Sequence, residues 1–480
     1  MGELLINIED FGAKRGETFN NAPAILAAFA EAETEGGGLV YAPPGVWGIN
    51  APVIVPAGVA FMGAGKEGGT IFSCMSAAAG VQFGLTSGGG TRRGLSGRFE
   101  VDGNDVATRP LVIALGANAD YIDISVADSA DIGLLIEGSQ NIGIYGLEVQ
   151  RCPKGLVVDR GAKNVTVTRG TINDCNTGIT IRMNLAHPTG LPEPARIVVT
   201  DVLCETVVSG GIGFQVNAGQ EIFFVRGALN VPTNGIAVKA ERLDPAGVGA
   251  HLRQIVLDGA QLAGGGGGTG VQLLSEVAVT MIGGAITQGT GTTFDVRNAD
   301  ARIDVDHTVV LDNASVRRFS TNTGRTEAQI ISHCGVWTME SLADVSATND
   351  ITFVQPAPLT LFTAEAESVW EVEADLMLDG STTGQAQVGW EVPAGSTFSW
   401  SSLGTELVAG VLQLSRQAVT SAPSFKTRGA GTPTQLRLTG LLKVASASGN
   451  IVPEFKQAAA DTAVPTRLLA GSTVRYRRIA

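Results

Sequence analysis

Residues 119–181 read ADYIDISVADSADIGLLIEGSQNIGIYGLEVQRCPKGLVVDRGAKNVTVTRGTINDCNTGITI. Two short runs of alternating apolar residues repeat in this stretch, and the second run of each unit opens with glycine. The pattern continues to about residue 319, with second runs that open at Gly133, Gly155, Gly178, Gly213, Gly235, Gly270 and Thr293. The intervals of 22, 23, 35, 22, 35 and 23 residues indicate a repeat of about 22 residues with two longer units. A repeat of this length with strand-like alternation and no helix predicts a solenoid of β coils.

The first runs of the units define the interior of this solenoid. Alternation places their aliphatic residues inside and polar residues outside, and stacked coils pair every backbone edge. A leucine-rich repeat has a similar length, but its leucine signature and its helical stretch are missing. We therefore predict an all-β protein whose main body is a right-handed, single-stranded parallel β-helix. The inward pairs are Ile122/Ile124, Ile142/Ile144, Val165/Val167, Ile197/Val199, Ile222/Phe224, Ile255/Leu257, Val279/Met281 and Ile303/Val305.

One helix is expected near the N-terminus. Residues 20–34, NNAPAILAAFAEAET, place Ile25, Leu26, Phe29 and Ala32 at helical spacing. Asn20 or Asn21 is the expected N-cap, and the glycines at 36–38 end the helix. Because the first coil of a solenoid would otherwise expose its apolar cross-section, this helix is predicted to cover it.

Residues 6–49, INIEDFGAKRGETFNNAPAILAAFAEAETEGGGLVYAPPGVWGI, closely resemble the opening of the pectate-lyase-superfamily type 3 domain. The shared features are an FGA turn, a capping helix, a glycine run and a strand that ends in P-x-G. The Asp-rich G-D-G-x-x-D-D-T stretch typical of that family is replaced here by residues 14–21, KRGETFNN. The resemblance implies the same β-helix fold, and its members include polysaccharide-active enzymes and many bacteriophage tailspikes.

The periodicity divides the chain into four parts. We predict an N-terminal cap at 1–50, the parallel β-helix at 51–319, and a neck or linker at 320–360 with Pro356 and Pro358. Residues 361–480 alternate with turns every 10–20 residues, which predicts a jelly-roll-like antiparallel β-sandwich. The order of cap, β-helix, neck and sandwich resembles trimeric phage tailspikes and minor tail proteins.

A row of charged residues offers candidate catalytic groups. Aligning the coils on their inner residues puts Asp128, Arg151, Asp174 and Glu205 in one outward column. Neighbours in such a column are about 5 Å apart and next neighbours about 10 Å, which brackets the carboxylate separations of glycosidases. Asp174 and Glu205 would act as acid and base or nucleophile, and Arg151 would keep Asp174 ionised. The alternative is a solvated charge ladder, which any β-helix can produce.

Two insertions lengthen one corner of two coils that have a single coil between them. They comprise residues 185–195 and 241–251 and could form the walls of a groove for a glycan, or be ordinary surface or intersubunit packing loops. No tryptophan occurs between Trp47 and Trp337, which argues against sugar cleavage in the coils. The tryptophans at 370, 390 and 400 are expected to be core or intersubunit packing rather than a sugar platform. The glycan-binding candidates are His187, Glu193, Glu241, Arg242 and Asp244.

Composition excludes other classes of function. With 46 acidic and 33 basic residues, the net charge of −13 argues against nucleic acid and anionic membranes as partners. No apolar stretch is long enough for membrane insertion, no signal peptide is visible, and four scattered histidines predict no metal site and no cofactor. Cys152 and Cys175 fall in adjacent coils, either as a disulfide or, as we expect for reducing surroundings, as stacked buried thiols.

These features predict a virion protein. We expect a homotrimeric tailspike or minor tail protein, made in the host cytoplasm without a signal peptide, that binds a bacterial surface polysaccharide and other tail proteins of the virion. The alternative is a glycan depolymerase that uses Asp174 and Glu205, either as part of such a spike or as a free glycoside hydrolase or polysaccharide lyase with a β-helix fold. A third hypothesis makes the β-helix a rigid spacer and assigns recognition to residues 361–480.

Overall fold

The computed structural model forms two compact units, Met1–Arg302 with Arg318–Thr323, and Ile303–Arg317 with Gly324–Ala480. The structure describes residues 5–66, 68–84, 95–183, 192–206, 208–242, 252, 254–287, 292–298, 301–306, 309–311, 319–321, 331–334, 336–340, 344–347, 355, 363–364, 368–380, 386–404, 413–418, 424–425, 431–446, 449–457 and 464–478.

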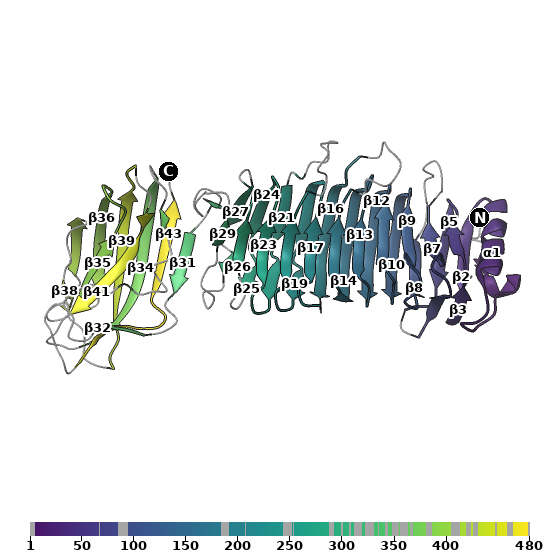
Figure 1. Ribbon diagram of the computed structural model, residues 1–480, viewed down its shortest axis with the longest axis horizontal. Coiled ribbons are helices and arrows are strands. Elements are labelled where there is room, and N and C mark those ends of the chain that lie inside the picture. The colour runs from purple at the N-terminus through teal and green to yellow at the C-terminus, as the bar shows by residue number, and fades with distance from the viewer. Residues whose placement is uncertain are drawn as a thin grey trace. The chain divides into compact units, whose positions relative to one another are not determined.

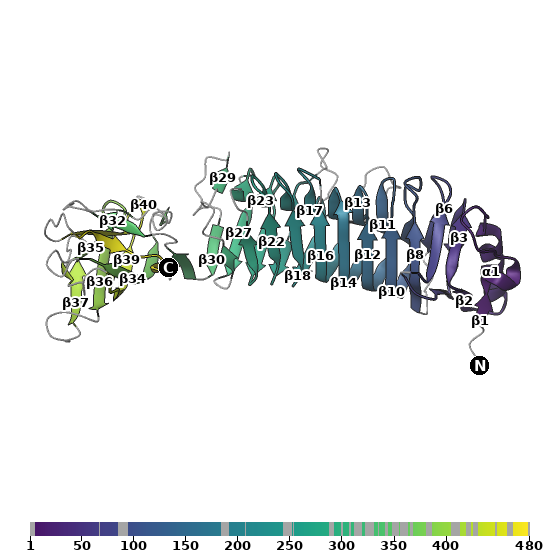
Figure 2. The same cartoon turned by 90° about the horizontal axis from the view of Figure 1, so that it is seen from below.

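The first unit is a right-handed parallel β-helix with one helix at its N-terminal end (Figures 1 and 2). Two parallel sheets run along it, and every strand pairs with its equivalent in the next coil. The first sheet contains β1 (Leu5–Asn7), β2 (Gly38–Ala42), β3 (Gly45–Ile49), β5 (Val59–Gly63), β6 (Thr70–Cys74), β8 (Leu95–Asp102), β10 (Ala117–Ala127), β12 (Gln140–Gln150), β14 (Lys163–Cys175), β16 (Ala195–Thr206), β18 (Gln220–Val225), β19 (Ala228–Val231), β21 (Gln254–Asp258), β22 (Gln261–Gly264), β24 (Ala278–Ile282) and β25 (Ala285–Thr287). The second sheet contains β4 (Pro52–Val55), β7 (Gly80–Phe83), β9 (Leu111–Ala114), β11 (Ile132–Glu137), β13 (Lys154–Val158), β15 (Thr177–Ile181), β17 (Ile212–Val216), β20 (Ile236–Ala240), β23 (Thr269–Leu273), β26 (Thr292–Val296) and β29 (Phe319–Thr321).

The coils bend within the first sheet at residues in the left-handed backbone conformation, with φ of 47° at Asp123, 57° at Arg169, 54° at Asp201 and 50° at Arg226. A residue with positive φ cannot continue a straight strand, so the sheet turns a corner there. The residues before the bend form what we call the first face, and those after it form the second face. The second sheet is the third face.

The interior register agrees with the sequence prediction for every predicted inward pair except the first, Ile122/Ile124. Ile144, Val167, Val199, Phe224 and Leu257 follow one another in adjacent coils and are completely buried. Their partner in the preceding coil is Tyr121, which is also completely buried, and Ile122 pairs with the outward Tyr145. The predicted pair Ile122/Ile124 was therefore out of register, because a buried tyrosine takes an interior position that aliphatic residues fill in later coils.

Glycine opens the second run of these coils because neighbouring atoms leave no room for a side chain. A Cβ atom added at Gly178 would lie 1.9 Å from Cys204 Sγ, and one at Gly155 would lie 2.5 Å from Ile172 Cγ2. The described cysteines are free thiols and buried, so the Cys152–Cys175 alternative is decided in favour of stacked thiols. A hydrogen bond between Cys152 and Cys175, together with burial, raises the pKa of the Cys152 thiol well above its ordinary value.

The N-terminal cap consists of η1 (Ile8–Phe11) and α1 (Ala22–Thr34). Ile25, Phe29 and Ala32 are buried as predicted, whereas Leu26 is 40% exposed. Asn21 precedes the helix, but its side chain makes no capping bond. Instead its Nδ2 donates to the carbonyls of Lys14, Phe19 and Gly48, and its Oδ1 accepts from the Lys14 N–H, so Asn21 ties the segment before the helix to β3.

The predicted neck contains regular structure, contrary to expectation. In the second unit, β27 (Arg302–Asp306) pairs in parallel with β30 (Ile331–Cys334), so the coil pattern extends past residue 320. β31 (Val336–Glu340) and β32 (Val345–Ala347) already belong to the antiparallel sheet that follows. The sequence of 320–360 hides these strands because they are short and separated by polar segments. The two-residue strand β28 (Val310–Leu311) lies between β27 and β30 in the chain.

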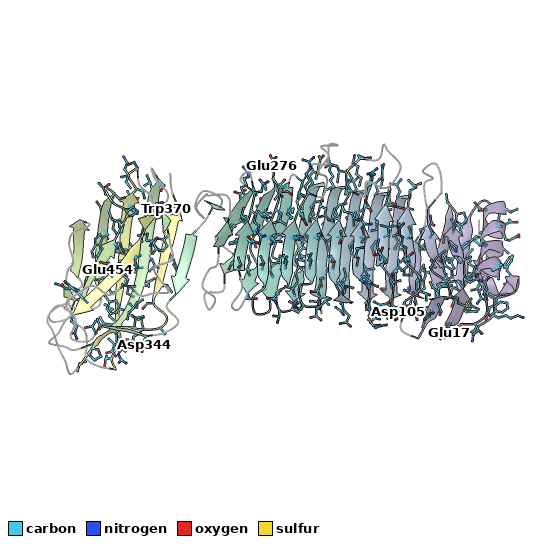
Figure 3. The ribbon with its side chains drawn as sticks, in the orientation of Figure 1. Glu17, Asp105, Glu276, Asp344, Trp370 and Glu454 are labelled. Atoms are coloured by element: carbon cyan, nitrogen blue, oxygen red, sulfur yellow. The ribbon has the colours of Figure 1, made fainter. Side chains whose placement is uncertain are left out.

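The rest of the second unit is an antiparallel β-sandwich, as predicted. Trp390 in one sheet and Phe398 in the other meet edge to face with ring centroids 5.4 Å apart. Trp370, Trp390 and Trp400 are 2%, 6% and 2% exposed, so these indoles are core residues and not an exposed platform. Figure 3 labels Trp370, which belongs to the long strand Val369–Asp379. The strands are β33 (Thr363–Ala364), β34 (Val369–Asp379), β35 (Ala386–Glu391), β36 (Thr397–Gly404), β37 (Gln413–Ala418), β38 (Ser424–Phe425), β39 (Thr434–Lys443), β40 (Gly449–Asn450), β41 (Val452–Gln457), β42 (Thr466–Leu468) and β43 (Thr473–Arg478).

Among the described residues, no helix has the length and apolar character needed to cross a bilayer.

Candidate functional site

Two outward columns run along the second face. The polar one runs through Gln150, Asn173, Glu205 and Asn230, whose residues pair in register from β12 to β19, and the other changes from Glu148 and Thr171 to Leu203 and Ala228. Asn230 Nδ2 donates to Glu205 Oε1 at 3.1 Å, and both side chains are exposed to solvent in part. The column offers amide donors, amide acceptors and a carboxylate at the spacing of the coils, which suits a chain of hydroxyl groups.

The candidate catalytic residues all lie on this face or at its edge, but not in one column. Asp128, Arg151 and Asp174 occupy equivalent turn positions with φ of 51°, 52° and 56°. Glu205 pairs with Asn173 instead of Asp174, because the register shifts between Asn173 and Cys175. Asp174 therefore has no paired residue in β16. Glu205 lies in the outward column of Gln150 and Asn173, and not in the turn column of Asp128, Arg151 and Asp174.

Arg151 also has a different partner from the one expected. Its Nε lies 2.6 Å from Asp128 Oδ1 and its second terminal nitrogen 2.8 Å from Asp128 Oδ2, a bidentate ion pair with the preceding coil. This hydrogen bonding to Asp128 raises the pKa of Arg151 further above its ordinary value, and Asp174 contributes only as a weaker charge. The sequence analysis assigned Arg151 as the counter-ion of Asp174, but its main partner is Asp128.

The structure brings together a second set of carboxyl groups that the sequence analysis missed. Glu100 and Glu148 both pair with Ser125, one from each neighbouring coil. Ser125 faces outward yet is only 2% exposed, since the longer side chains on either side of it cover it. Lys66 reaches this position, with its Nζ 3.1 Å from Glu148 Oε2. We call Glu100, Ser125, Glu148 and Lys66 the carboxylate recess.

Two carboxyl groups at the recess hold protons more tightly than usual. Burial is the largest cause that raises the pKa of Glu100, followed by the charges of Asp102 and Glu148. Burial also raises the pKa of Asp102, partly offset by the Asn104 backbone N–H that donates to it. Carboxyl groups with raised pKa values beside other carboxylates are typical of acid and base catalysis, although they also occur in purely structural clusters.

The raised pKa of Glu100 predicts a pH-dependent effect on stability. Replacing Glu100 with glutamine should raise the midpoint of thermal unfolding at pH 8 by about 1–3 °C, because the wild type then carries an ionised, half-buried carboxylate near Asp102 and Glu148. The difference should vanish near pH 4, where the folded wild type already has Glu100 protonated. Scanning calorimetry at both pH values measures it, with Glu33→Gln, at an exposed position of α1, as the control. A larger gain at pH 4 than at pH 8 would contradict the assignment.

The two insertions leave the same corner of the β-helix, as predicted. One connects β15 to β16 and the other connects β20 to β21, with the coil of β17 and β18 between them. Glu241 pairs with Lys239 at 2.6 Å, and the Arg242 N–H donates to Ser275 Oγ. Glu193 lies just before β16 and is half-buried. His187 and Asp244 lie outside the described residues.

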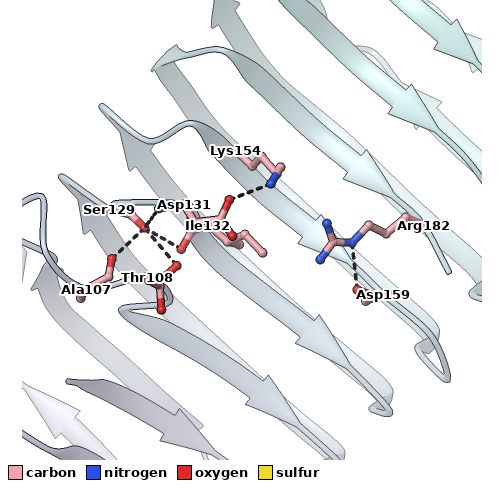
Figure 4. A network of polar contacts seen from close by, with 8 residues as sticks. All are labelled: Ala107, Thr108, Ser129, Asp131, Ile132, Lys154, Asp159 and Arg182. Carbon is pink, nitrogen blue, oxygen red and sulfur yellow. Dashed lines mark hydrogen bonds and ion pairs between the residues drawn. The ribbon is translucent and has the colours of Figure 1, made fainter. Parts of the chain in front are cut away.

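Polar contacts at both ends of the third-face strands hold adjacent coils together (Figure 4). Ser129 Oγ donates to the Ile132 carbonyl at 2.9 Å, and Lys154 Nζ lies 2.7 Å from Asp131 Oδ1 in the preceding coil. Arg182 Nε lies 2.9 Å from Oδ2 of the buried Asp159, one coil earlier. Each ion pair joins equivalent turns of successive coils, so this network has a structural role.

Within the described part of the chain, no group of three or more His, Cys, Asp or Glu side chains is arranged to hold a metal ion.

A family model matches the N-terminal part of the chain. Residues 5–89 match the family model described as "Rhamnogalacturonase A/epimerase, pectate lyase-like". The comparison with curated proteins found no match.

Solved structures with a similar arrangement include enzymes, adhesins and phage proteins. The A-module of the mannuronan C-5 epimerase AlgE4 of Azotobacter vinelandii has 13% identity and a TM-score of 0.47, over 68% of this chain and 100% of that chain. The surface adhesin PfbA of Streptococcus pneumoniae has 11% identity and a TM-score of 0.42, over 69% and 94%. The tailspike protein of Acinetobacter baumannii phage AM24 has 10% identity and a TM-score of 0.40, over 98% and 84%. The described coils and the match at residues 5–89 identify a right-handed parallel β-helix of the pectate-lyase type.

Proposed function

We propose that this protein is a tailspike or minor tail protein of a bacteriophage and that it binds a polysaccharide of the bacterial surface along the second face of its β-helix. The observation that carries the proposal is the run of amide, hydroxyl and carboxylate side chains on that face, from Glu148 and Gln150 to Asn230. Sugar hydroxyls both donate and accept hydrogen bonds, and on this surface the amides of Gln150, Asn173 and Asn230 offer both partners while Glu205 offers acceptors.

The order of the parts supports the phage assignment. A capping helix, a parallel β-helix and an antiparallel sandwich follow one another along this chain, as in the tailspikes that the sequence resembles. Within this proposal the protein is a homotrimer located in the virion tail, and its partners are other tail proteins and the polysaccharide. The insertion residues Glu241 and Arg242, which leave the β-helix at the corner before the first face, would contact the glycan or a neighbouring subunit.

Binding to isolated polysaccharide tests the proposal. Capsular polysaccharides and lipopolysaccharides from a panel of bacterial strains are immobilised, and binding of the full chain is measured by biolayer interferometry. For the polysaccharide that is retained, the double variant Glu205→Ala with Asn230→Ala should bind at least tenfold more weakly, since it loses two polar contacts of about 1 kcal/mol each. Gln215→Ala, an outward substitution on the third face, is the matched control and should bind like the wild type. Equal affinities of the double variant and the control would contradict the proposal.

A second candidate function is cleavage of the bound polysaccharide, and the carboxylate recess favours it. Glu100 and Glu148 are two coils apart, or roughly 10 Å between their Cα atoms. Cleavage with inversion needs carboxyl groups about 6.5–9.5 Å apart with a water molecule between them, so a bound sugar would have to part the side chains that cover Ser125. Protonated Glu100 would donate its proton to the departing glycosidic oxygen, and Glu148 would take a proton from the water that attacks the anomeric carbon.

Release of reducing ends from the retained polysaccharide distinguishes the two carboxylate sets. If the recess is catalytic, Glu100→Gln and Glu148→Gln should each lower the rate 10²-fold or more while binding persists. Asp174→Asn should then leave the rate within about threefold of the wild type. Loss of turnover in Asp174→Asn and Glu205→Gln alone would instead support the set proposed from the sequence. A wild type that binds but releases no product would restrict the function to adhesion.

A further inference from the structure

The outer surface of the first face carries an apolar cluster over three coils. Val198, Phe223 and Val256 pair in register across β16, β18 and β21 and point outward, because their neighbours Val199, Phe224 and Leu257 are completely buried. Val225 lies beside Phe223 in the next outward column, and the exposed Asp258 follows Val225 there and ends the apolar area. We call four residues the first-face patch: Val198, Phe223, Val225 and Val256.

The patch is local and therefore specific. In the preceding coils the column of Val198 contains Gly143 and Thr166, and the column of Val225 contains Tyr145, Thr168 and Thr200. The second face of the patch coils instead carries Glu205 and Asn230. A contiguous apolar area on a solenoid, bounded by polar residues, is the usual mark of a protein contact. A glycan would gain little from aliphatic side chains, so this surface differs in chemistry from the second face.

Charged residues at both edges of the patch indicate what covers it. At the edge where the strands begin, Arg196 and Glu221 lie in adjacent coils, with Arg196 Nε 2.7 Å from Glu221 Oε2. At the opposite edge, where the coils bend, Asp201 and Arg226 lie in the same two coils and pair at 3.1 Å. Each coil thus has opposite charges at its two edges: Arg196 with Asp201, and Glu221 with Arg226. All four side chains are well exposed and can accept a further partner.

This arrangement is complementary to itself in one orientation. Consider two copies that pack side by side and parallel, with equivalent coils at the same height. The edge where the strands begin (the leading edge) of one patch then meets the edge where the coils bend (the bend edge) of the other. Asp201 then faces Arg196 and Arg226 faces Glu221 across the contact. A shift by one coil would place Asp201 opposite Glu221, which are like charges, so the edges select the level register.

We propose that the first-face patch is the surface through which copies of this chain pack in parallel, with their coils level. Leading edge against bend edge is a heterologous contact, and three copies close it into a ring. The inference deepens the homotrimer of the proposed function by assigning its interface, and it leaves the second face of each copy free for a glycan.

The solution mass of the full chain tests this interface, measured by multi-angle light scattering and by sedimentation velocity at micromolar concentration. The wild type should be a trimer. Val256→Glu should shift the protein to monomer, because it places a charge in the apolar centre of the contact. Val208→Glu, at an apolar residue that is 40% exposed outside the patch, is the matched control and should stay trimeric. A monomeric wild type, or a Val256→Glu protein with the mass of the wild type, would overturn the proposal.

A charge exchange tests the register without touching the core. Arg196→Glu combined with Glu221→Arg keeps the ion pair within the chain but opposes like charges between copies, so the trimer should dissociate at least tenfold more readily. Adding Asp201→Arg and Arg226→Asp restores every pair and should restore the trimer. An unchanged trimer in the first exchange would overturn the parallel, level packing. Glycan binding is measured separately on the same proteins. A trimer that disassembles as expected but retains no polysaccharide would contradict the proposed function and leave this interface standing.

Discussion

Replacing Gly178 with alanine should destabilise the β-helix by about 3 kcal/mol, at the upper end for an overpacked core. The new Cβ would lie 1.9 Å from Cys204 Sγ and 2.7 Å from the Gly213 carbonyl oxygen. Neither neighbour can move away easily, because Cys204 is buried between coils and Gly213 is part of β17. Thermal unfolding at a fixed scan rate should show a lower midpoint for the variant.

Two further variants isolate the cause. Cys204→Ala in the Gly178→Ala background removes the closest contact and should recover part of the loss, with the clash against the Gly213 carbonyl remaining. Gly116→Ala is the matched control, since the nearest atom to its added Cβ is 3.8 Å away. If Gly178→Ala and Gly116→Ala melt alike, the glycine and cysteine packing described here is wrong.

Replacing Asn21 with alanine should cost about 3 kcal/mol and should release the N-terminal cap. The side chain is completely buried and makes four hydrogen bonds, three as donor to backbone carbonyls and one as acceptor from the Lys14 N–H. Alanine would leave these groups without their partner in a place that water reaches poorly. The expected result is earlier unfolding and rapid proteolysis within residues 5–37.

Asn20→Ala is the control for the cap. Asn20 Oδ1 accepts two hydrogen bonds, from the N–H groups of Ala22 and Asn50, each at 3.2 Å. Its loss should cost about 1 kcal/mol, the usual value for an N-terminal capping side chain. Equal effects of the two substitutions would show that Asn21 does not hold the cap together as described.

The sequence carried enough information for the fold because the interior is periodic. Ile144, Val167, Val199 and Phe224 repeat at intervals of 23, 32 and 25 residues, the longest of which contains an insertion, and a repeated inward column is what a parallel β-helix requires. The first coil was misaligned by the residues around Tyr121, since an aromatic side chain breaks the aliphatic column that the alignment followed. Strands β30 and β31 were missed because short strands without repeated neighbours have no periodic signal.

The candidate site depended on features that a periodic alignment does not contain. One additional residue, Asp174, shifts the turn relative to β16 and moves Glu205 out of the expected column. Arg151 was assigned to Asp174, yet the bidentate geometry favours Asp128 in the preceding coil. The carboxylate recess was missed because Glu100 precedes the clearly repeated region, so its position beside Ser125 is visible only from strand pairing. The spacing of acidic residues alone therefore predicts which face carries the candidate carboxylates, but not which two of them lie close together.

The faces of the coils divide the chemistry of this protein. The second face carries amides, hydroxyls and carboxylates, and the first face carries the apolar patch with charged edges. The turns beside the third face carry ion pairs between coils, such as Lys154 with Asp131. Solenoids allow this separation because the interior fixes the coil geometry and each outward column is free to vary.

Carboxylate footprinting tests the central claim, that a surface polysaccharide lies along the second face. The full chain is treated with a carbodiimide and an amine, with and without the polysaccharide that it retains, and labelled residues are quantified by mass spectrometry. We expect the polysaccharide to protect Glu148 and Glu205 several-fold, while Glu221 and Asp258 on the first face keep the labelling they have without it. Protection confined to Glu221 and Asp258, or unchanged labelling at Glu148 and Glu205 with polysaccharide bound, would contradict it.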